Sequence, residues 1–213
     1  MVQKIGAEPR RLGRPRAYDP KTALERARNR FWKSGYAGTS LDEICAATGM
    51  NRPSLYAAFG DKHTLYLKAL ESYWRLSLDV MREALADGDQ PLRDALMRAY
   101  DGQLSIYFLS DGPTRGCFVI GTALTEAMED PEIRKSLAEG FRLMDTDFEV
   151  RFRLAHERGE LKDDVDPAAL AVLASGVLHT IAIRARAGVT RVELREIASK
   201  AVTVICGRPA DGG

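Results

Sequence analysis

The chain has 213 residues, 45% of them hydrophobic and 29% charged, which is typical of a soluble globular protein with a sizeable core. A formal net charge of +1 argues against a sequence-tolerant architectural DNA-binding protein, because the affinity of such proteins depends on strong electrostatic attraction to the DNA phosphates. Three cysteines without CxxC spacing predict neither a disulfide framework nor a zinc site, and they favour a reduced, cytoplasmic compartment.

Targeting and membrane segments are not expected. The N-terminus is basic and lacks the apolar core of a signal peptide. The longest apolar stretches, such as 168–174, fall short of the ~20 residues that span a bilayer, so no membrane partner is predicted.

Charge is distributed unevenly along the chain. Residues 1–75 contain 14 Lys and Arg against 7 Asp and Glu, whereas the remainder contains 17 against 23. A basic first third suits a polyanionic partner, and the acidic remainder does not. The two parts are therefore expected to have different tasks.

Residues 1–18 are rich in Arg, Gly and Pro and predict a flexible basic arm. Arg14 and Arg16 flank Pro15 in a GRPR segment similar to an AT-hook core, in which Arg enters an A·T-rich minor groove. The alternative is a solvated tail that adds only screened attraction. The two interpretations stay open.

The region 19–65 predicts a three-helix unit. Asp19 caps a helix that ends near Gly35, and Pro20 takes its first position. Ser40 and Glu43 form a capping-box pattern for a helix over 41–48, which Gly49 ends. A short helix over 52–58 follows.

The rest of the chain also reads as helices, and no run alternates with strand periodicity beyond a few residues. Asp61 caps a long helix over 62–86. Five further helices are predicted at 91–109, 116–128, 131–158, 167–187 and 192–205. The predicted fold class is therefore all-α, with about nine helices. Four parts are expected: a flexible basic arm at 1–18, a DNA-binding head at 19–65, a ligand-binding and dimerisation bundle at 66–206, and a disordered tail at 207–213.

The two short helices of the head predict a helix-turn-helix. Asn51, Arg52, Ser54 and Tyr56 offer polar groups on or beside one exposed face, whereas Leu55 and Phe59 point inward. Other side chains can hold phosphates at the two ends of the run, namely Thr39, Ser40 and Lys62. The alternative is a generic helical hairpin with solvated polar residues.

The same run resembles the TetR/AcrR family of one-component transcriptional regulators. The matching positions are Phe31, Gly35, Thr39, Ser40, Ile44, Ala47, Gly49, Leu55, Tyr56, Phe59, Lys62 and Leu65. The resemblance implies that Tyr56 and Lys62 contact phosphates, that Thr39 contacts the DNA backbone, and that Asn51, Arg52 and Ser54 lie near bases.

The run departs from the family pattern at two places. Pro53 replaces a small residue that is often Gly, and Ala57 with Ala58 replaces a Tyr or His that also touches DNA in many members. Contacts from the two alanines are limited to apolar ones, such as a thymine methyl group.

The resemblance also implies a small-molecule effector enclosed by the C-terminal bundle, with no cofactor and no metal. The candidate ligand-binding residues form an aromatic and methionine stripe, for which ordinary core is the alternative. They are Trp74, Tyr107, Phe108, Phe118, Met128, Phe141, Met144, Phe148 and His179.

The last two helices carry small and apolar residues on several sides, which favours burial in a homodimer interface. A twofold homodimer would match a palindromic double-stranded DNA operator. A central helix of a monomer is the alternative. The expected function is a ligand-responsive repressor, with an activator or a thiol-based redox sensor at Cys117 as alternatives. An enzyme that uses the C-terminal cavity is the last alternative. It is not expected, because His63, His156 and His179 lack metal-ligand spacing.

Overall fold

A computed structural model describes residues 19–108 and 114–207. The arm residues Arg14 and Arg16 and most of the tail lie outside this part of the chain. Within it the structure holds nine α-helices, one π-helical segment and no strand, which confirms the all-α prediction. The elements are α1 (Pro20–Ser34), α2 (Leu41–Thr48), α3 (Arg52–Phe59), α4 (Lys62–Leu85), α5 (Leu92–Tyr107), η1 (Val119–Ala123), α6 (Leu124–Glu126), α7 (Pro131–Glu157), α8 (Pro167–Arg186) and α9 (Arg191–Cys206).

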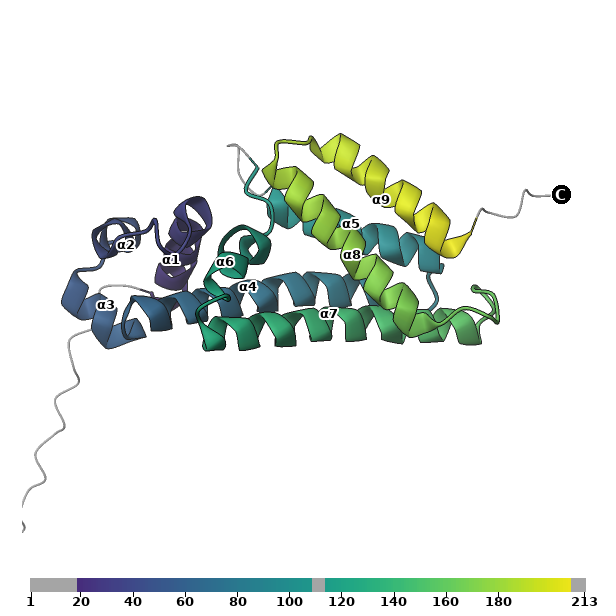
Figure 1. Ribbon diagram of the computed structural model, residues 1–213, viewed down its shortest axis with the longest axis horizontal. Helices are drawn as coiled ribbons and strands as arrows, with labels where there is room; N and C mark the ends of the chain where they lie inside the picture. The colour runs from purple at the N-terminus through teal and green to yellow at the C-terminus, as the bar shows by residue number, and fades with distance from the viewer. Residues whose placement is uncertain (1–18, 109–113, 208–213) are drawn as a thin grey trace, which may run out of the picture.

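The molecule is elongated, with a small head at one end and a larger helical body (Figure 1). Helices α1, α2 and α3 form the head, and α2 and α3 lie at the end farthest from the C-terminus. The long helix α4 runs from the head into the body, where it packs against α5 and α7. Motion of the head relative to the body therefore has to involve α4.

Side-chain caps explain where the head helices begin. Asp19 accepts hydrogen bonds from the N–H groups of Lys21 and Thr22, and Asp61 accepts one from Thr64. Ser40 and Glu43 form the predicted capping box on α2. Each cap satisfies backbone donors that a helix start leaves unpaired, so the sequence alone locates these boundaries.

Aromatic side chains fill the junction between head and body. Tyr66 on α4 packs against Phe31 of α1, with ring centroids 5.1 Å apart, and against Phe118 just before η1, at 5.8 Å. Trp32 packs edge-on against the same Phe118 at 5.8 Å. Phe118 is completely buried, so it belongs to the packing that joins α1, α4 and η1.

The predicted helix over 116–128 needs correction. Gly116 has a left-handed φ of +63°, and the chain from Val119 to Ala123 winds as a π-helix before α6. The buried hydroxyl of Thr122 donates to the carbonyl of Phe118 and lies 2.8 Å from the hydroxyl of Tyr66. The π-helical turn is thus accompanied by contacts between residues far apart in the sequence. Such turns are frequent at functional sites.

Helix α8 is more apolar than the sequence analysis recognised. By length and composition it is able to cross a bilayer, with a mean hydropathy of 1.7 over 18 residues, of which 39% are buried. The expectation that no segment reaches this length was therefore wrong. In the structure α8 packs along α7 and α9, so part of its apolar surface is core of the body.

Candidate DNA-reading surface and effector core

Helix α3 presents its first turn at the outer end of the head (Figure 1). Asn51 is the N-cap of α3, and its side-chain oxygen accepts the N–H of Ser54 at 2.9 Å. The amide NH2 group of Asn51 is left to face outward, because the residue is exposed. Asn51 is thus both the start of the helix and a hydrogen-bond donor at its tip, a capping role that the sequence analysis missed.

Arg52 is exposed, but its guanidinium is already engaged. Its Nε and Nη2 atoms donate to Asp42 on α2, at distances of 3.1, 2.8 and 2.9 Å. Hydrogen bonds to the Asp42 carboxylate raise the pKa of Arg52 above its ordinary value. In this structure Asp42 therefore occupies the guanidinium N–H groups that could otherwise donate to a base or a phosphate.

The remaining predicted reading residues are accessible. Tyr56 is 43% exposed, and Ser54 is partly exposed one turn before Ala58. Ala57 is exposed beside Tyr56 and offers only a methyl group. The polar surface of α3 is consequently small, as the two alanines predicted.

The predicted phosphate clamp at Thr39 and Ser40 needs correction. Thr39 is only 1% exposed, and its hydroxyl donates to the carbonyl of Gly35 at 2.7 Å. Ser40 is exposed, but its N–H and its hydroxyl both contact the carboxylate of Glu43. Thr39 therefore holds the turn between α1 and α2 and is too buried to contact a phosphate, whereas Ser40 caps α2 and remains exposed, so its phosphate contact stays a prediction.

Lys62 at the start of α4 lies beside the head. Its Nζ atom sits 4.4 Å from the centre of the Tyr36 ring, a cation–π contact. Tyr36 also packs against Tyr66, with ring centroids 5.0 Å apart. The ammonium group is thus held near the head surface without a carboxylate partner among the described residues.

The residue after Lys62 joins the head to the body, which the sequence analysis did not recognise. His63 Nε2 lies 2.6 Å from Asp130 Oδ2, and its Nδ1 lies 3.7 Å from Glu132. Asp130 also caps α7 through its other oxygen. The contact spans 67 positions of sequence, so no local pattern could have indicated it.

The candidate effector residues do not form one site. Trp74, Phe141 and His179 make a cluster between α4, α7 and α8, with Phe141 edge-on to Trp74 at 5.5 Å and to His179 at 5.0 Å. Trp74 Nε1 and His179 Nε2 are buried and have no hydrogen-bond partner within residues 19–108 and 114–207. Burial lowers the pKa of His179 below its ordinary value, against an opposing effect of Asp145.

The other candidates lie elsewhere. Phe148 packs between Tyr100 and Phe152 in the core, and Tyr107 is buried near Cys117. Phe108 is partly buried against the core and Met144 is buried in it. Met128 is 78% exposed at the turn after α6, so it lines no internal pocket. Its prediction as a ligand contact was wrong, because the aromatic and methionine pattern cannot distinguish core from surface.

Three surface cavities are lined by other residues. One of about 440 Å³ lies between α1 and α4, and one of about 510 Å³ lies around His63 and Asp130. A third, of about 430 Å³, lies at the far end of the body, between the start of α8 and the end of α9.

Comparisons with known proteins agree with this geometry. The N-terminal model of the bacterial regulatory proteins of the tetR family matches residues 23–69, and a tetracyclin repressor-like C-terminal domain model matches residues 103–200. The chain belongs to the TetR family. It is a helix-turn-helix transcriptional regulator.

Relatives of this TetR-family regulator cover most of its length. The repressor ComR of Escherichia coli K12 is 27% identical over 87% of this chain and 88% of its own. The uncharacterized regulator YezE of Bacillus subtilis 168 is 30% identical over 75% and 82%. A cysteine mutant of the regulator CifR, solved with 26-base-pair double-strand operator DNA, is 33% identical over 92% and 100%, with a TM-score of 0.81.

The regulator has a partly exposed cysteine, Cys117, whose thiol is directed into the junction. Tyr73 donates its hydroxyl hydrogen to the Cys117 sulfur at 3.2 Å. Burial raises the pKa of the Cys117 thiol above its ordinary value. Arg115, the basic residue two positions before Cys117, extends over the Trp32 ring and donates to Asn29.

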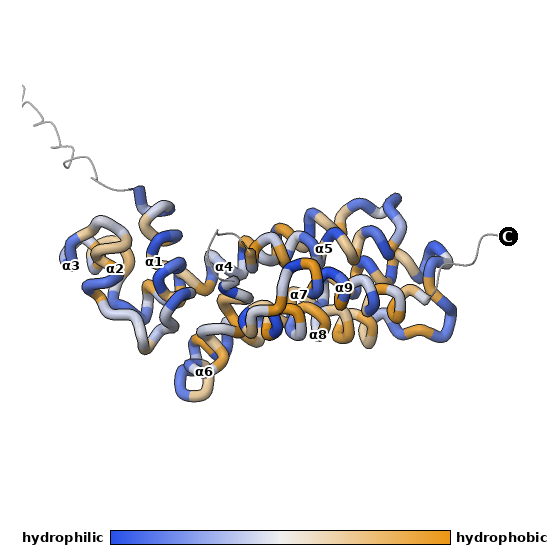
Figure 2. Tube along the Cα trace, turned by 90° about the horizontal axis from the view of Figure 1, so that it is seen from above, coloured by the Kyte–Doolittle hydropathy of each residue, from blue (hydrophilic) through white to orange (hydrophobic). Residues whose placement is uncertain are grey.

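Helix α8 is rich in hydrophobic residues (Figure 2), and several of them are exposed. Val172 and Leu173 are both 59% exposed and Ile183 is 56% exposed, on the same side as Gly176. A Cβ added at Gly176 would meet no atom within 4 Å. The exposed face of α9 is mixed, since charged residues such as Arg195 and Glu196 accompany Val192 and Val204.

Proposed function

We propose that this TetR-family protein is a repressor that binds a palindromic operator as a homodimer and leaves it when a small molecule binds the body. The single observation that carries the DNA-binding part is the exposed face of α3, where Arg52 and Tyr56 project beside the N-cap Asn51. The operator complex of the 33% identical CifR mutant supports the same use of the fold.

The dimer is supported by the exposed face of α8. Isolated exposed hydrophobic residues are ordinary, but Val172, Leu173 and Ile183 share one face with the open position at Gly176. A twofold axis at this face would place two α3 helices on one side of the molecule for two half-sites of a palindrome.

The effector part rests on unsatisfied polar atoms in the body. Trp74 Nε1 and His179 Nε2 are buried around Phe141 without hydrogen-bond partners in the described part of the chain, and such groups are costly unless something pairs with them. We place the effector against this cluster. A ligand with one hydrogen-bond acceptor and an apolar body would satisfy the indole N–H while packing on Phe141.

Repression is favoured over activation because ComR, BdcR and AcnR are repressors. The proposed role is regulatory rather than catalytic, and it is exercised in the cytoplasm, where the operator is. Among the described residues no group of His, Cys, Asp and Glu is arranged to hold a metal ion.

Selection of bound fragments from genomic DNA, followed by footprinting, tests the DNA-binding part. The full chain should protect a palindrome, and Arg52→Ala should weaken binding by about 1–3 kcal/mol and relax specificity at one base position. Arg142→Ala, which removes an exposed arginine from the outer face of α7, is the matched control. Equal binding by the two variants would contradict the assignment of α3 as the reading helix.

A further inference from the structure

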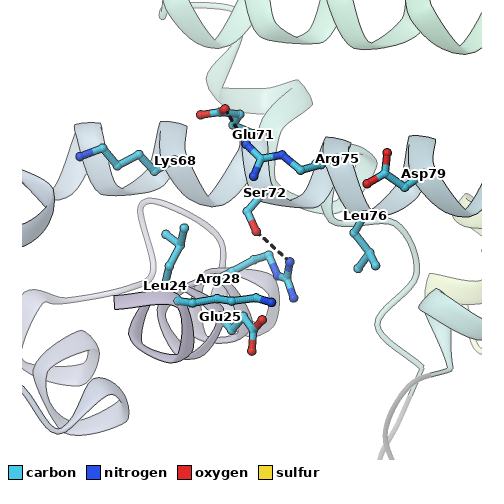
Figure 3. Close-up of a pocket in the computed structure, with 10 residues that line it drawn as sticks. Leu24, Glu25, Arg28, Lys68, Glu71, Ser72, Arg75, Leu76 and Asp79 are labelled. Carbon is cyan, nitrogen blue, oxygen red and sulfur yellow. Dashed lines mark hydrogen bonds and ion pairs between the residues drawn. The ribbon is translucent and has the colours of Figure 1, made fainter. Parts of the chain in front are cut away.

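The groove between α1 and α4 is lined on both sides by side chains from one face of each helix (Figure 3). It has a volume of about 440 Å³ and lies where the head meets the body, away from the Trp74 cluster. Its lining residues are Lys21, Leu24, Glu25, Arg28, Lys68, Glu71, Ser72, Arg75, Leu76 and Asp79.

Arg28 is the one lining group whose hydrogen-bonding needs are clearly unmet. It extends from α1 toward α4 and donates through Nη1 to Ser72 Oγ at 3.1 Å (Figure 3). Its Nε atom is buried without a hydrogen-bond partner among the described residues, and burial lowers the pKa of this guanidinium against an opposing effect of Glu25. Across residues 19–108 and 114–207 no carboxylate lies within ion-pair distance of Arg28, although Arg75 in the same groove pairs with Glu71.

Ser72 adds a second donor at the same point. Its oxygen accepts the Arg28 hydrogen bond, and its own hydroxyl hydrogen has no acceptor within the described part of the chain. The Ser72 hydroxyl and the Arg28 guanidinium, which has N–H groups beyond the one bonded to Ser72, therefore lie together in the lining of the groove. Two donors side by side match the two oxygens of a carboxylate.

The walls beside this pair are apolar. Leu24 on α1 and Leu76 on α4 are half-buried and face the groove from opposite helices. Lys68 is turned away, because its Nζ donates to the carbonyl of Phe59. Glu25, three residues before Arg28 on α1, acts on the guanidinium through its charge without forming an ion pair, and Asp79 also lines the groove.

We propose that this groove is a binding site for a small aliphatic carboxylate, held by Arg28 and Ser72 at its charged end and by Leu24 and Leu76 along its chain. A bound ligand would connect α1 of the head with α4 at the point where the two helices separate. The site is distinct from the effector cluster, and its occupancy does not depend on DNA.

Titration of the full ¹⁵N-labelled chain with sodium hexanoate tests the site directly. Amides of Leu24, Arg28, Ser72 and Leu76 should shift with saturation, whereas hexan-1-ol, which lacks the carboxylate, should give no saturable shift. Arg28→Met should raise the dissociation constant at least about tenfold, because it removes a charge-assisted pair of donors. Arg26→Met, an exposed arginine of the same helix, should leave it unchanged.

Ser72→Ala provides a second variant, with an expected weakening of about threefold, in case the Arg28 variant does not fold. The proposal is overturned by no saturation up to about 10 mM hexanoate, ten times the concentration for a 1 mM Kd. Equal binding of hexan-1-ol, or equal loss in the Arg26 and Arg28 variants, also overturns it. Because no DNA is present, failure here leaves the proposed function intact.

Discussion

The guanidinium of Arg52 on α3 is held by both carboxylate oxygens of Asp42 on α2. Both side chains of the pair are exposed, that of Arg52 by 55% and that of Asp42 by 76%. The pair links the two helices of the proposed DNA-reading unit, and it places a negative charge beside the guanidinium that is proposed to contact DNA. Exposed pairs of this kind contribute about 0–1 kcal/mol, so DNA can replace the carboxylate at small cost.

Asp42→Asn is therefore expected to strengthen operator binding roughly two- to fivefold, because it frees Arg52 and removes a repulsive charge. Fluorescence anisotropy with an operator duplex at fixed salt measures the change. Asp164→Asn, an exposed carboxylate in the turn between α7 and α8, makes the same change in net charge and should have little effect. Weaker binding by Asp42→Asn would show that the pair serves mainly to position α3.

Lys62 is expected to move from the Tyr36 ring to a phosphate when DNA binds. Lys62→Ala should weaken binding to all sequences similarly and lower the slope of log affinity against log salt concentration by about 1. Salt titrations of the wild type and the variant measure this slope. An unchanged slope would mean that Lys62 stays on Tyr36, where its Nζ lies 4.4 Å from the ring centre.

The head was largely predictable from the sequence because its signals are local. The caps at Asp19, Ser40 and Asp61 lie within three residues of the N–H groups they satisfy, so a short window contains both partners. The ion pair between Arg52 and Asp42 was not predictable, because it depends on how α2 and α3 are oriented relative to each other. Burial of Thr39 likewise depends on the α1–α2 turn.

The helices of the body could be predicted from the sequence, but the position of a binding site among them could not. The π-helix at Val119–Ala123 is tied to tertiary contacts such as that between Thr122 and Tyr66, which lie 56 positions apart. Aromatic and methionine residues at helical spacing indicate an apolar face, yet they do not say what covers it. Phe118 is completely buried in the junction and Met128 is 78% exposed, although both fit the same pattern.

The exposed face of α8 leads to a prediction about assembly. Leu173→Glu should produce a monomer and reduce operator affinity at least about tenfold, because a charge buried at an interface without a partner is strongly unfavourable. Light scattering after size exclusion measures the mass. Val150→Glu, at a 64% exposed position on α7, is the control and should leave the mass unchanged. A wild-type monomer at micromolar concentration would contradict the homodimer.

Cys117 is expected to be a structural thiol. Its raised pKa keeps the thiolate population small, and the thiolate is the reactive form. Cys117→Ser should therefore leave the release of operator by diamide or by alkylating electrophiles unchanged. Release that disappears in this variant, while the wild type responds, would instead establish the redox-sensing alternative.

His179 leads to a prediction about pH. Its folded-state pKa lies below the ordinary value near 6.5, so the unfolded chain binds a proton more readily than the native protein does. Stability from the neutral, buried imidazole is thus present above the unfolded pKa and is lost as pH falls below it. Thermal unfolding of the wild type should show a melting temperature that falls between pH 7 and pH 5, to which His179 contributes. His179→Phe, which keeps an aromatic ring beside Phe141, should flatten this part of the profile. An equally steep profile in the variant would assign the loss of stability to groups other than His179.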